Sequence, residues 1–289
     1  MDTKEKHEKF LYPCVRVLSA RAGGSGTIIY SEPDPVNEGD FVTIILTNHH
    51  VVDSSISYRD EWDSVLKKDR KQEIFQKVDV DVFDYVRMST VDSAQRYKAD
   101  IVAYDKVHDL ALLKMDSPRK FPYVATLIPE ERVRNLRLFQ DVVVAGCSLL
   151  HDPFCTFGQI TYLSEIIDMK EYLMSNANSI FGNSGGALYL KDTGELLGVP
   201  SRVTVNQLGF GLDVQTWMGF SSHPKRLYEF FREQEMQFLF DRTDTFKASR
   251  ERREKMRLEG VTDDKDTKPK TKKNEEPGIP EWGDGDGVG

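Results

Sequence analysis

Short apolar runs separated by Gly, Pro, Asn and Asp fill the first part of the chain. Residues 15–18 (VRVL), 26–30 (GTIIY) and 41–46 (FVTIIL) are rich in β-branched side chains, which favour strands. A second series runs from about residue 122 to residue 219, with strands predicted at 141–146, 158–162, 186–190 and 196–199. Several short strands divided by turn residues predict an all-β fold, either a barrel or a sandwich.

Three stretches depart from this pattern and predict helices. Residues 59–76 are rich in charged helix formers, with apolar residues at helical spacing, so we expect a helical insertion at about residues 54–95. Ser222 is expected to cap a later helix that has Pro224 in its first turn and an apolar face including Phe230 and Phe231. A more polar helix is predicted at residues 245–259, before Gly260.

The composition changes after Gly260, where Lys, Asp, Glu, Pro and Gly dominate and apolar residues nearly vanish. Such a segment buries too little apolar surface to offset the entropy lost on ordering it. We therefore predict a disordered tail over residues 260–289. The tail and the polar helix before it could bind a partner protein, although a solvated helix and a free end are the simpler interpretation.

The net charge is −8, and acidic and basic residues are interspersed along most of the chain. No basic face of the kind that binds nucleic acid stands out, and no run is long and apolar enough to span a bilayer. The highly charged N-terminus lacks the apolar core of a secretory signal. We expect a soluble, intracellular, cytoplasmic protein that binds neither nucleic acid nor membrane.

Cysteines are few: Cys14, Cys147 and Cys155. This odd, sparse count argues against a disulfide framework and indicates reduced thiols in a reducing compartment. No Cys/His cluster has the spacing of a zinc site. The sequence therefore predicts no metal and no cofactor.

The segment Phe181-Gly-Asn-Ser-Gly-Gly-Ala-Leu188 has the composition of a nucleophilic turn. A serine hydroxyl is a poor nucleophile and needs a base and an oxyanion hole. The glycines around Ser184 allow a tight backbone path that can aim the N–H groups of Gly182 and Ser184 at one point. The alternative interpretation is a glycine-rich turn between strands.

Two further segments offer the partners that such a serine needs. Leu46-Thr-Asn-His-His-Val-Val52 contains His49 and His50 at the end of a predicted strand, where an imidazole could accept the serine proton. Asp109 precedes the apolar run Leu110-Ala-Leu-Leu113, and a carboxylate there needs a partner such as a histidine N–H. Taken alone, the histidine could be a surface or capping residue and the aspartate a turn residue. His, Asp and Ser in this order, each in its own apolar frame, rarely arise together by chance.

These segments resemble the chymotrypsin/trypsin superfamily of serine peptidases. The closest resemblance is to its high-temperature-requirement (HtrA, or Deg) branch, without the PDZ domain of that branch. Residues 24–30 (GSGTIIY) resemble a strand of the family's first barrel, and residues 97–114 resemble its aspartate segment almost throughout. Residues 46–52 and 182–186 (GNSGG) resemble its histidine and serine motifs, so the resemblance covers roughly residues 10–220.

The resemblance implies two six-stranded antiparallel β-barrels with the active site between them. We expect an N-terminal barrel at residues 1–120, a C-terminal barrel at residues 121–222, and helices at residues 223–259. The family's motif also selects His50 over His49 as the base, because the catalytic histidine directly precedes the small apolar pair.

The same resemblance assigns residues to binding. It gives the oxyanion hole to the amides of Gly182 and Ser184, and the substrate pocket to four further residues. These pocket residues are Asn178, Ser201, Val203 and Gly209. Pro200 and Arg202 depart from the family pattern in the strand that pairs with substrate.

The function expected from these features is hydrolysis of peptide bonds in a protein or peptide substrate, through an acyl-enzyme on Ser184. The alternative is a trypsin-fold protein that is catalytically silent or active only under some conditions, and acts as a binding or regulatory module.

Overall fold

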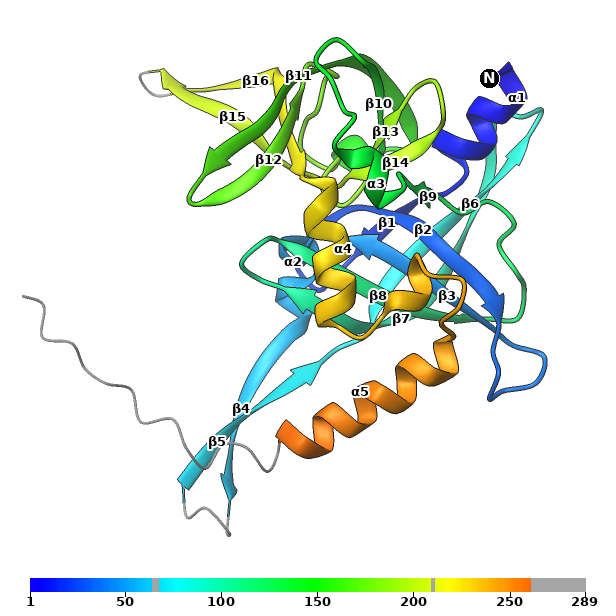
Figure 1. The fold of residues 1–289 in the computed structure, drawn as a ribbon, viewed down its shortest axis with the longest axis vertical. Helices are drawn as coiled ribbons and strands as arrows, with labels where there is room; N and C mark the ends of the chain where they lie inside the picture. The colour runs from blue at the N-terminus through cyan, green and yellow to red at the C-terminus, as the bar shows by residue number, and fades with distance from the viewer. Residues whose placement is uncertain (64–67, 209–210, 261–289) are drawn as a thin grey trace, which may run out of the picture.

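Six strands of the first half close into a barrel with the order β1–β2–β3–β8–β7–β6 (Figure 1). They are β1 (Cys14–Leu18), β2 (Gly23–Pro33), β3 (Phe41–Thr47), β6 (Val78–Val86), β7 (Thr90–Asp105) and β8 (Leu110–Ser117). Valine and isoleucine side chains such as Val17, Ile45 and Val80 alternate inward and fill the barrel, because successive residues of a strand point to opposite faces. The computed structural model describes residues 1–63, 68–208 and 211–260.

The second half is one sheet of eight strands in the order β15–β16–β12–β11–β10–β13–β14–β9. Its strands are β9 (Thr126–Leu127), β10 (Asp141–Gly146), β11 (Phe154–Ile167), β12 (Lys170–Ser175), β13 (Ala187–Leu190), β14 (Glu195–Gly198), β15 (Pro200–Leu208) and β16 (Gly211–Ser222). The short β9 pairs in parallel with β14, and the other pairs are antiparallel. The expected all-β class and chymotrypsin-like arrangement of two β units are confirmed, with eight strands rather than six in the second unit.

The predicted helical insertion at residues 54–95 is wrong. Strands β4 (Ile56–Asp63) and β5 (Lys68–Phe75) form a two-stranded arm that projects from the barrel, and β6 and β7 occupy most of the remainder (Figure 1). The two strands pair in antiparallel register from Ile56 opposite Phe75 to Asp63 opposite Lys68. The many charged residues of this segment are also good helix formers, so composition alone could not decide.

Within the described residues, the helices before residue 200 are all short. They are α1 (Thr3–Lys6), the π-helical η1 (His7–Leu11), α2 (His49–Val52), η2 (Asp53–Ser55), α3 (Glu130–Val133) and η3 (Ser148–Leu150). Two of them, α2 and η3, lie at the functional site described below. All three cysteines carry free thiols.

The helices expected after the second β unit are present as α4 (Pro224–Glu233), η4 (Gln237–Leu239) and α5 (Phe246–Gly260). The N-cap of α4 is His223 rather than Ser222, which still belongs to β16. Leu227, Phe230 and Phe231 are fully buried in one apolar cluster with residues of both β units. Burial of each such side chain contributes about 1.5–3 kcal/mol, so α4 is anchored rigidly across the two halves.

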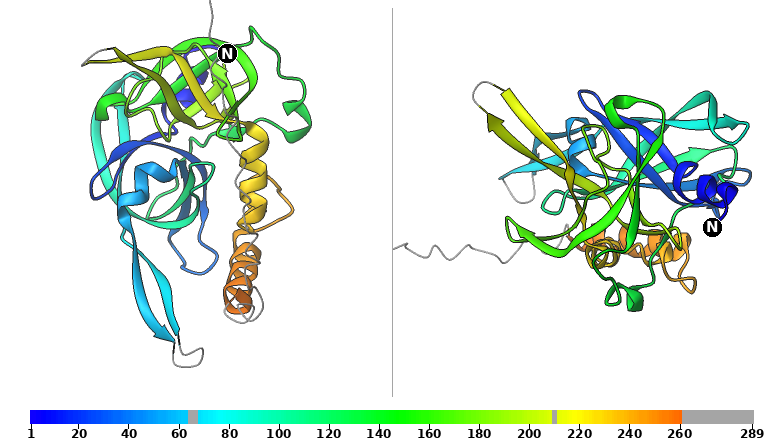
Figure 2. Two further views of the ribbon diagram at one scale, coloured as in Figure 1. Left: turned by 90° about the vertical axis from the view of Figure 1, so that its left-hand side faces the viewer. Right: turned by 90° about the horizontal axis from the view of Figure 1, so that it is seen from above.

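Helix α5 follows α4 along the same side of the molecule (Figure 2). Its polar sequence docks through specific contacts: Phe246 packs against Phe238 with ring centroids 5.6 Å apart, and Arg252 pairs with Asp244 and Glu235. In the described part of the chain, no helix has the length and apolar character needed to cross a membrane. The predicted disordered tail lies outside the described residues, apart from Gly260 at the end of α5.

Candidate active site

His50 lies in the short helix α2, directly after the buried strand β3. Val51 and Val52 are buried and anchor this helix in the barrel core, while the His50 side chain is 49% exposed. His49 has the opposite environment: it is buried, its ring lies 5.0 Å from that of Tyr104, and burial lowers its pKa below the ordinary value. Of the two candidate histidines, only His50 faces the pocket described below.

Asp109 ends the turn between β7 and β8 and lies beside His50. One carboxylate oxygen, Oδ2, is 2.8 Å from His50 Nδ1, and the other, Oδ1, accepts the backbone N–H of His50 at 2.9 Å. Asn48 donates from Nδ2 to the carbonyl of Asp109 at 2.7 Å. His50 and Asp109, which lie 59 positions apart in the sequence, are therefore joined by two hydrogen bonds, and a third joins Asp109 to the neighbouring Asn48.

This pairing fixes the chemistry of the imidazole. An ionised carboxylate can only accept hydrogen bonds, so His50 Nδ1 carries the proton that faces Asp109. In a neutral ring, the other nitrogen, Nε2, is then an acceptor. The pair therefore holds His50 in the tautomer that a general base requires, and Asp109 can stabilise the imidazolium once it forms.

Ser184 lies in the turn between β12 and β13, and two glycines give this turn its shape. Gly182 has φ +96° and Gly185 has φ +86°, the left-handed region that other residues rarely adopt. A Cβ atom on Gly185 would come within 2.1 Å of the carbonyl oxygen of Ser25, and one on Gly182 within 2.4 Å of the Leu149 nitrogen. Only glycine is compatible with both positions.

The resemblance assigns an oxyanion hole to the N–H groups of Gly182 and Ser184, and the serine turn leaves both without a partner among the described residues. The carbonyl of Phe181 accepts the N–H of Leu149 at 2.8 Å, and because the peptide unit is planar and trans, the N–H of Gly182 points the opposite way. Neither Gly182 N nor Ser184 N donates a hydrogen bond to any residue in the described ranges. Two adjacent unpaired donors of this kind can stabilise negative charge on a reacting oxygen.

Two serines outside the histidine, aspartate and serine motifs hold this turn in place. Ser25, in β2, donates from Oγ to the carbonyl of Gly182 at 2.6 Å and accepts the N–H of Cys147 at 2.7 Å. Its own N–H donates to the carbonyl of Ser184 at 2.8 Å. Ser148, in η3, donates to the side-chain oxygen of the buried Asn183. The serine turn is thus tied both to the first barrel and to η3.

His50 and Ser184 line one pocket of about 400 Å³. The other lining residues come from the segment before Ser184 and from β15; they are Ser179, Ile180, Phe181, Pro200, Ser201, Arg202, Val203 and Val205. No hydrogen bond joins His50 Nε2 to Ser184 Oγ among the described contacts. Such bonds are often long without substrate and tighten when substrate binds.

The four residues expected in the substrate pocket have different positions. Ser201 and Val203 line it. Asn178 does not line the pocket: its side chain is exposed, and its carbonyl accepts a hydrogen bond from Thr156 of β11 at 2.7 Å. The next two residues, Ser179 and Ile180, line the pocket instead. Gly209 lies outside the described residues.

Strand β15 has a free edge beside the pocket, because it is the outermost strand of its sheet. Pro200 has no N–H to offer at this edge, and its carbonyl accepts the N–H of Gly185 at 3.1 Å. Arg202 pairs with Asp168 at 3.0 Å, and its guanidinium carbon lies 5.3 Å from the centre of the Tyr172 ring. An extended peptide could still add to the remainder of this edge.

Comparison with known proteins agrees with this geometry. Residues 24–199 match the family described as the trypsin-like peptidase domain, a stretch that contains His50, Asp109 and Ser184. The match is to the domain family as a whole and does not distinguish the HtrA branch. No curated protein matches the chain. The family match covers more than half of the sequence, and we conclude that the chain belongs to the trypsin-like peptidase family.

Proposed function

We propose that the protein is a serine endopeptidase in which Ser184 is the nucleophile, His50 the general base and Asp109 the residue that orients the base. The observation that carries this proposal is the 2.8 Å contact between His50 Nδ1 and Asp109 Oδ2, beside a pocket that His50 and Ser184 share. The free amides of Gly182 and Ser184 support it, because they supply the electrostatic part of the mechanism.

The proposed reaction is acyl transfer in two halves. His50 Nε2 accepts the proton of Ser184 Oγ as this oxygen attacks the peptide carbonyl, and the amides of Gly182 and Ser184 bind the oxyanion. The imidazolium, stabilised by Asp109, then protonates the leaving amine. Water attacks the acyl-enzyme with His50 again as base, which releases the acid and restores Ser184.

The pocket supports an uncharged residue before the scissile bond, because the charge of its lining residue Arg202 is paired with Asp168. None of its lining residues in the described chain is acidic, so nothing there would neutralise a lysine or arginine side chain. Ile180 and Val203 provide apolar walls, and Ser179 and Ser201 provide small ones. A small or medium uncharged side chain suits such a site.

Hydrolysis of an unfolded protein by the wild type and by Ser184→Ala tests the proposal. We expect cleavage by the wild type and a loss of about three orders of magnitude or more in turnover for the variant. Equal cleavage by both proteins would mean that another group, or a contaminating protease, performs the reaction. A folded wild type that neither cleaves protein nor reacts at Ser184 would favour the alternative, a catalytically silent binding module.

A further inference from the structure

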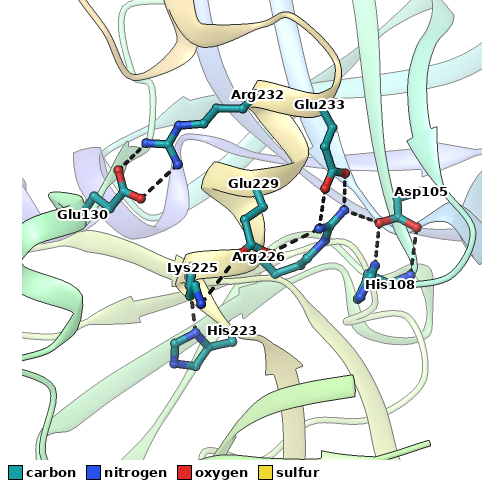
Figure 3. A network of polar contacts seen from close by, with 9 residues as sticks. All are labelled: Asp105, His108, Glu130, His223, Lys225, Arg226, Glu229, Arg232 and Glu233. Atoms are coloured by element: carbon teal, nitrogen blue, oxygen red, sulfur yellow. Dashed lines mark hydrogen bonds and ion pairs between the residues drawn. The ribbon is translucent and has the colours of Figure 1, made fainter. Parts of the chain in front are cut away.

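The turn that carries Asp109 is organised by a second carboxylate, Asp105. Asp105 Oδ1 accepts the backbone N–H of Val107 at 2.9 Å. Its contacts with His108 are shown in Figure 3: Oδ1 accepts the backbone N–H at 3.0 Å, and Oδ2 accepts from Nδ1 at 2.7 Å. The same Oδ2 accepts from Arg226 Nη2 of α4 at 2.7 Å. Asp105 therefore joins the turn to a helix that lies 121 positions later in the sequence.

Arg226 is largely buried and surrounded by carboxylates. Its side chain is 15% exposed, and that of Asp105 is 13% exposed. Besides Asp105, the guanidinium pairs with Glu233, at 2.8 Å from Nη1 to Oε1, and with Glu229 at 3.3 Å (Figure 3). Burial raises the pKa of the Asp105 carboxyl, but hydrogen bonds from His108 and Arg226 outweigh it and hold that pKa below the ordinary value.

Asp109 needs such support because its backbone is strained. Its φ is +58°, a conformation that costs a non-glycine residue of order 1–3 kcal/mol and persists only where its surroundings impose it. Lys106 and Val107 of the same turn are exposed, so apolar packing contributes little there. Helix α4 is by contrast fixed by its buried phenylalanines, and Arg226 transmits that rigidity to the turn.

We propose that Arg226 and Asp105 are a positioning pair for the catalytic aspartate: they hold the turn of residues 105–109 so that Asp109 meets His50. The inference rests on the proposed function, in which Asp109 orients the base. It makes the C-terminal helix a working part of the active site, although no residue of α4 lines the pocket that contains Ser184.

Arg226→Gln tests the pair, and Arg232→Gln is a matched control. Arg232 lies on the same helix and pairs with Glu130, away from the Asp109 turn (Figure 3). We expect Arg226→Gln to lower kcat by about tenfold to a hundredfold, the cost of a misplacement near 1 Å at a catalytic group, with KM unchanged. Arg232→Gln should keep the wild-type kcat. Equal losses in both variants, or a lower melting temperature with normal kcat for Arg226→Gln, would overturn the inference.

Proton NMR reports on the hydrogen bond between His50 and Asp109, which would not change if Arg226 contributed to stability alone. The His50 Nδ1 proton, shared with Asp109, should give a downfield resonance in the wild type and in Arg232→Gln, and should lose it in Arg226→Gln. This measurement needs no turnover, so it tests the positioning pair independently of the proposed peptidase function. An inactive wild type would contradict the proposed function, while the resonance would still decide whether Arg226 holds Asp109 in place. Persistence of the resonance in a folded Arg226→Gln variant contradicts the pair.

Asp105→Asn provides a second route, should Arg226→Gln fold poorly. It should reproduce the loss of kcat and of the resonance, and Arg226→Lys should restore part of both because an ammonium can still reach Asp105. In the double variant Arg226→Gln/Asp105→Asn the losses should be far from additive, as expected for residues of one network. Additive losses, or a wild-type resonance in Asp105→Asn, would show that the pair does not act as a unit on Asp109.

Discussion

Ser25 Oγ donates a hydrogen bond to the carbonyl of Gly182 at 2.6 Å, across 157 positions of sequence. The contact joins a strand of the first barrel to the turn that carries Ser184. It fixes the peptide that follows Gly182, while Leu149 fixes the peptide that precedes it. The orientation of the proposed oxyanion-hole donors therefore depends on residues outside the serine motif.

Ser25→Ala should impair catalysis through this contact. Without the hydroxyl, the carbonyl of Gly182 and the N–H of Cys147 lose a partner, and the serine turn can leave the orientation that exposes its amides. We expect kcat to fall by about tenfold or more, less than the roughly hundredfold to thousandfold loss on removing an oxyanion donor itself, with KM little changed. Steady-state kinetics on a peptide substrate measure this.

Ser31→Ala is the control for that substitution. Ser31 is also a buried serine of β2, bonded to Thr43 and to the N–H of Phe121, but it does not contact the serine turn. Both variants should lose about 1–3 kcal/mol of stability through unpaired buried groups. Equal kcat values in the two variants would mean that Ser25 serves stability alone.

Variants of the two neighbouring histidines should differ in what they lose: catalysis for His50 and stability for His49. His50→Ala removes the proposed base and should lower turnover by about three orders of magnitude or more. His49→Ala removes a buried ring that packs against Tyr104, so it should lower stability while kcat stays close to the wild type. Kinetics and urea unfolding of both variants measure this, and an inactive but stable His49→Ala variant would reverse the assignment of the base.

The buried His49 also predicts a dependence of stability on pH. Burial lowers its pKa more than Asp53 and Asp109 raise it, so below the ordinary value of about 6.5 the unfolded chain binds this proton more readily than the folded one. The free energy of unfolding should therefore fall as pH drops from 7 toward 5. His49→Gln should show a smaller fall in urea unfolding across this range, and identical pH dependence in both proteins would contradict the assignment.

The residue preferred before the scissile bond should match the side chains that line the pocket. A peptide library should be cleaved after small or medium uncharged residues, since no acidic side chain lines the described pocket. Sequencing of the cleavage products measures the preference. A strong preference for cleavage after lysine or arginine would show that a group outside the described lining binds the substrate.

The sequence predicted the parts of this site that are encoded locally. The glycines around Ser184, the apolar pair after His50 and the apolar run after Asp109 each act within a few residues of the side chain that they place. Ser25, Ser148 and Arg226 could not be found in this way, because their partners lie 157, 35 and 121 positions away. Only the folded barrel brings such residues together.

The wrong helix prediction has a different cause. Large apolar side chains of the two-stranded arm, Ile74 and Phe75 among them, are exposed, so the burial that usually selects between a period of 3.6 and a period of 2 is missing. In the structure, Tyr58 and Trp62 of β4 are more than half exposed, and cross-strand pairing rather than a core defines the arm. Whether the C-terminal helix and tail bind a partner stays a prediction.

The central claim is that Ser184 is a nucleophile activated by His50. Reaction with a fluorophosphonate, followed by mass spectrometry of the labelled peptide, tests it most directly. We predict a single phosphonylated residue, Ser184, in the wild type, with labelling abolished in Ser184→Ala and strongly slowed in His50→Ala. A folded wild type that takes up no label at Ser184, or a Ser184→Ala variant labelled as fast as the wild type, would contradict the account.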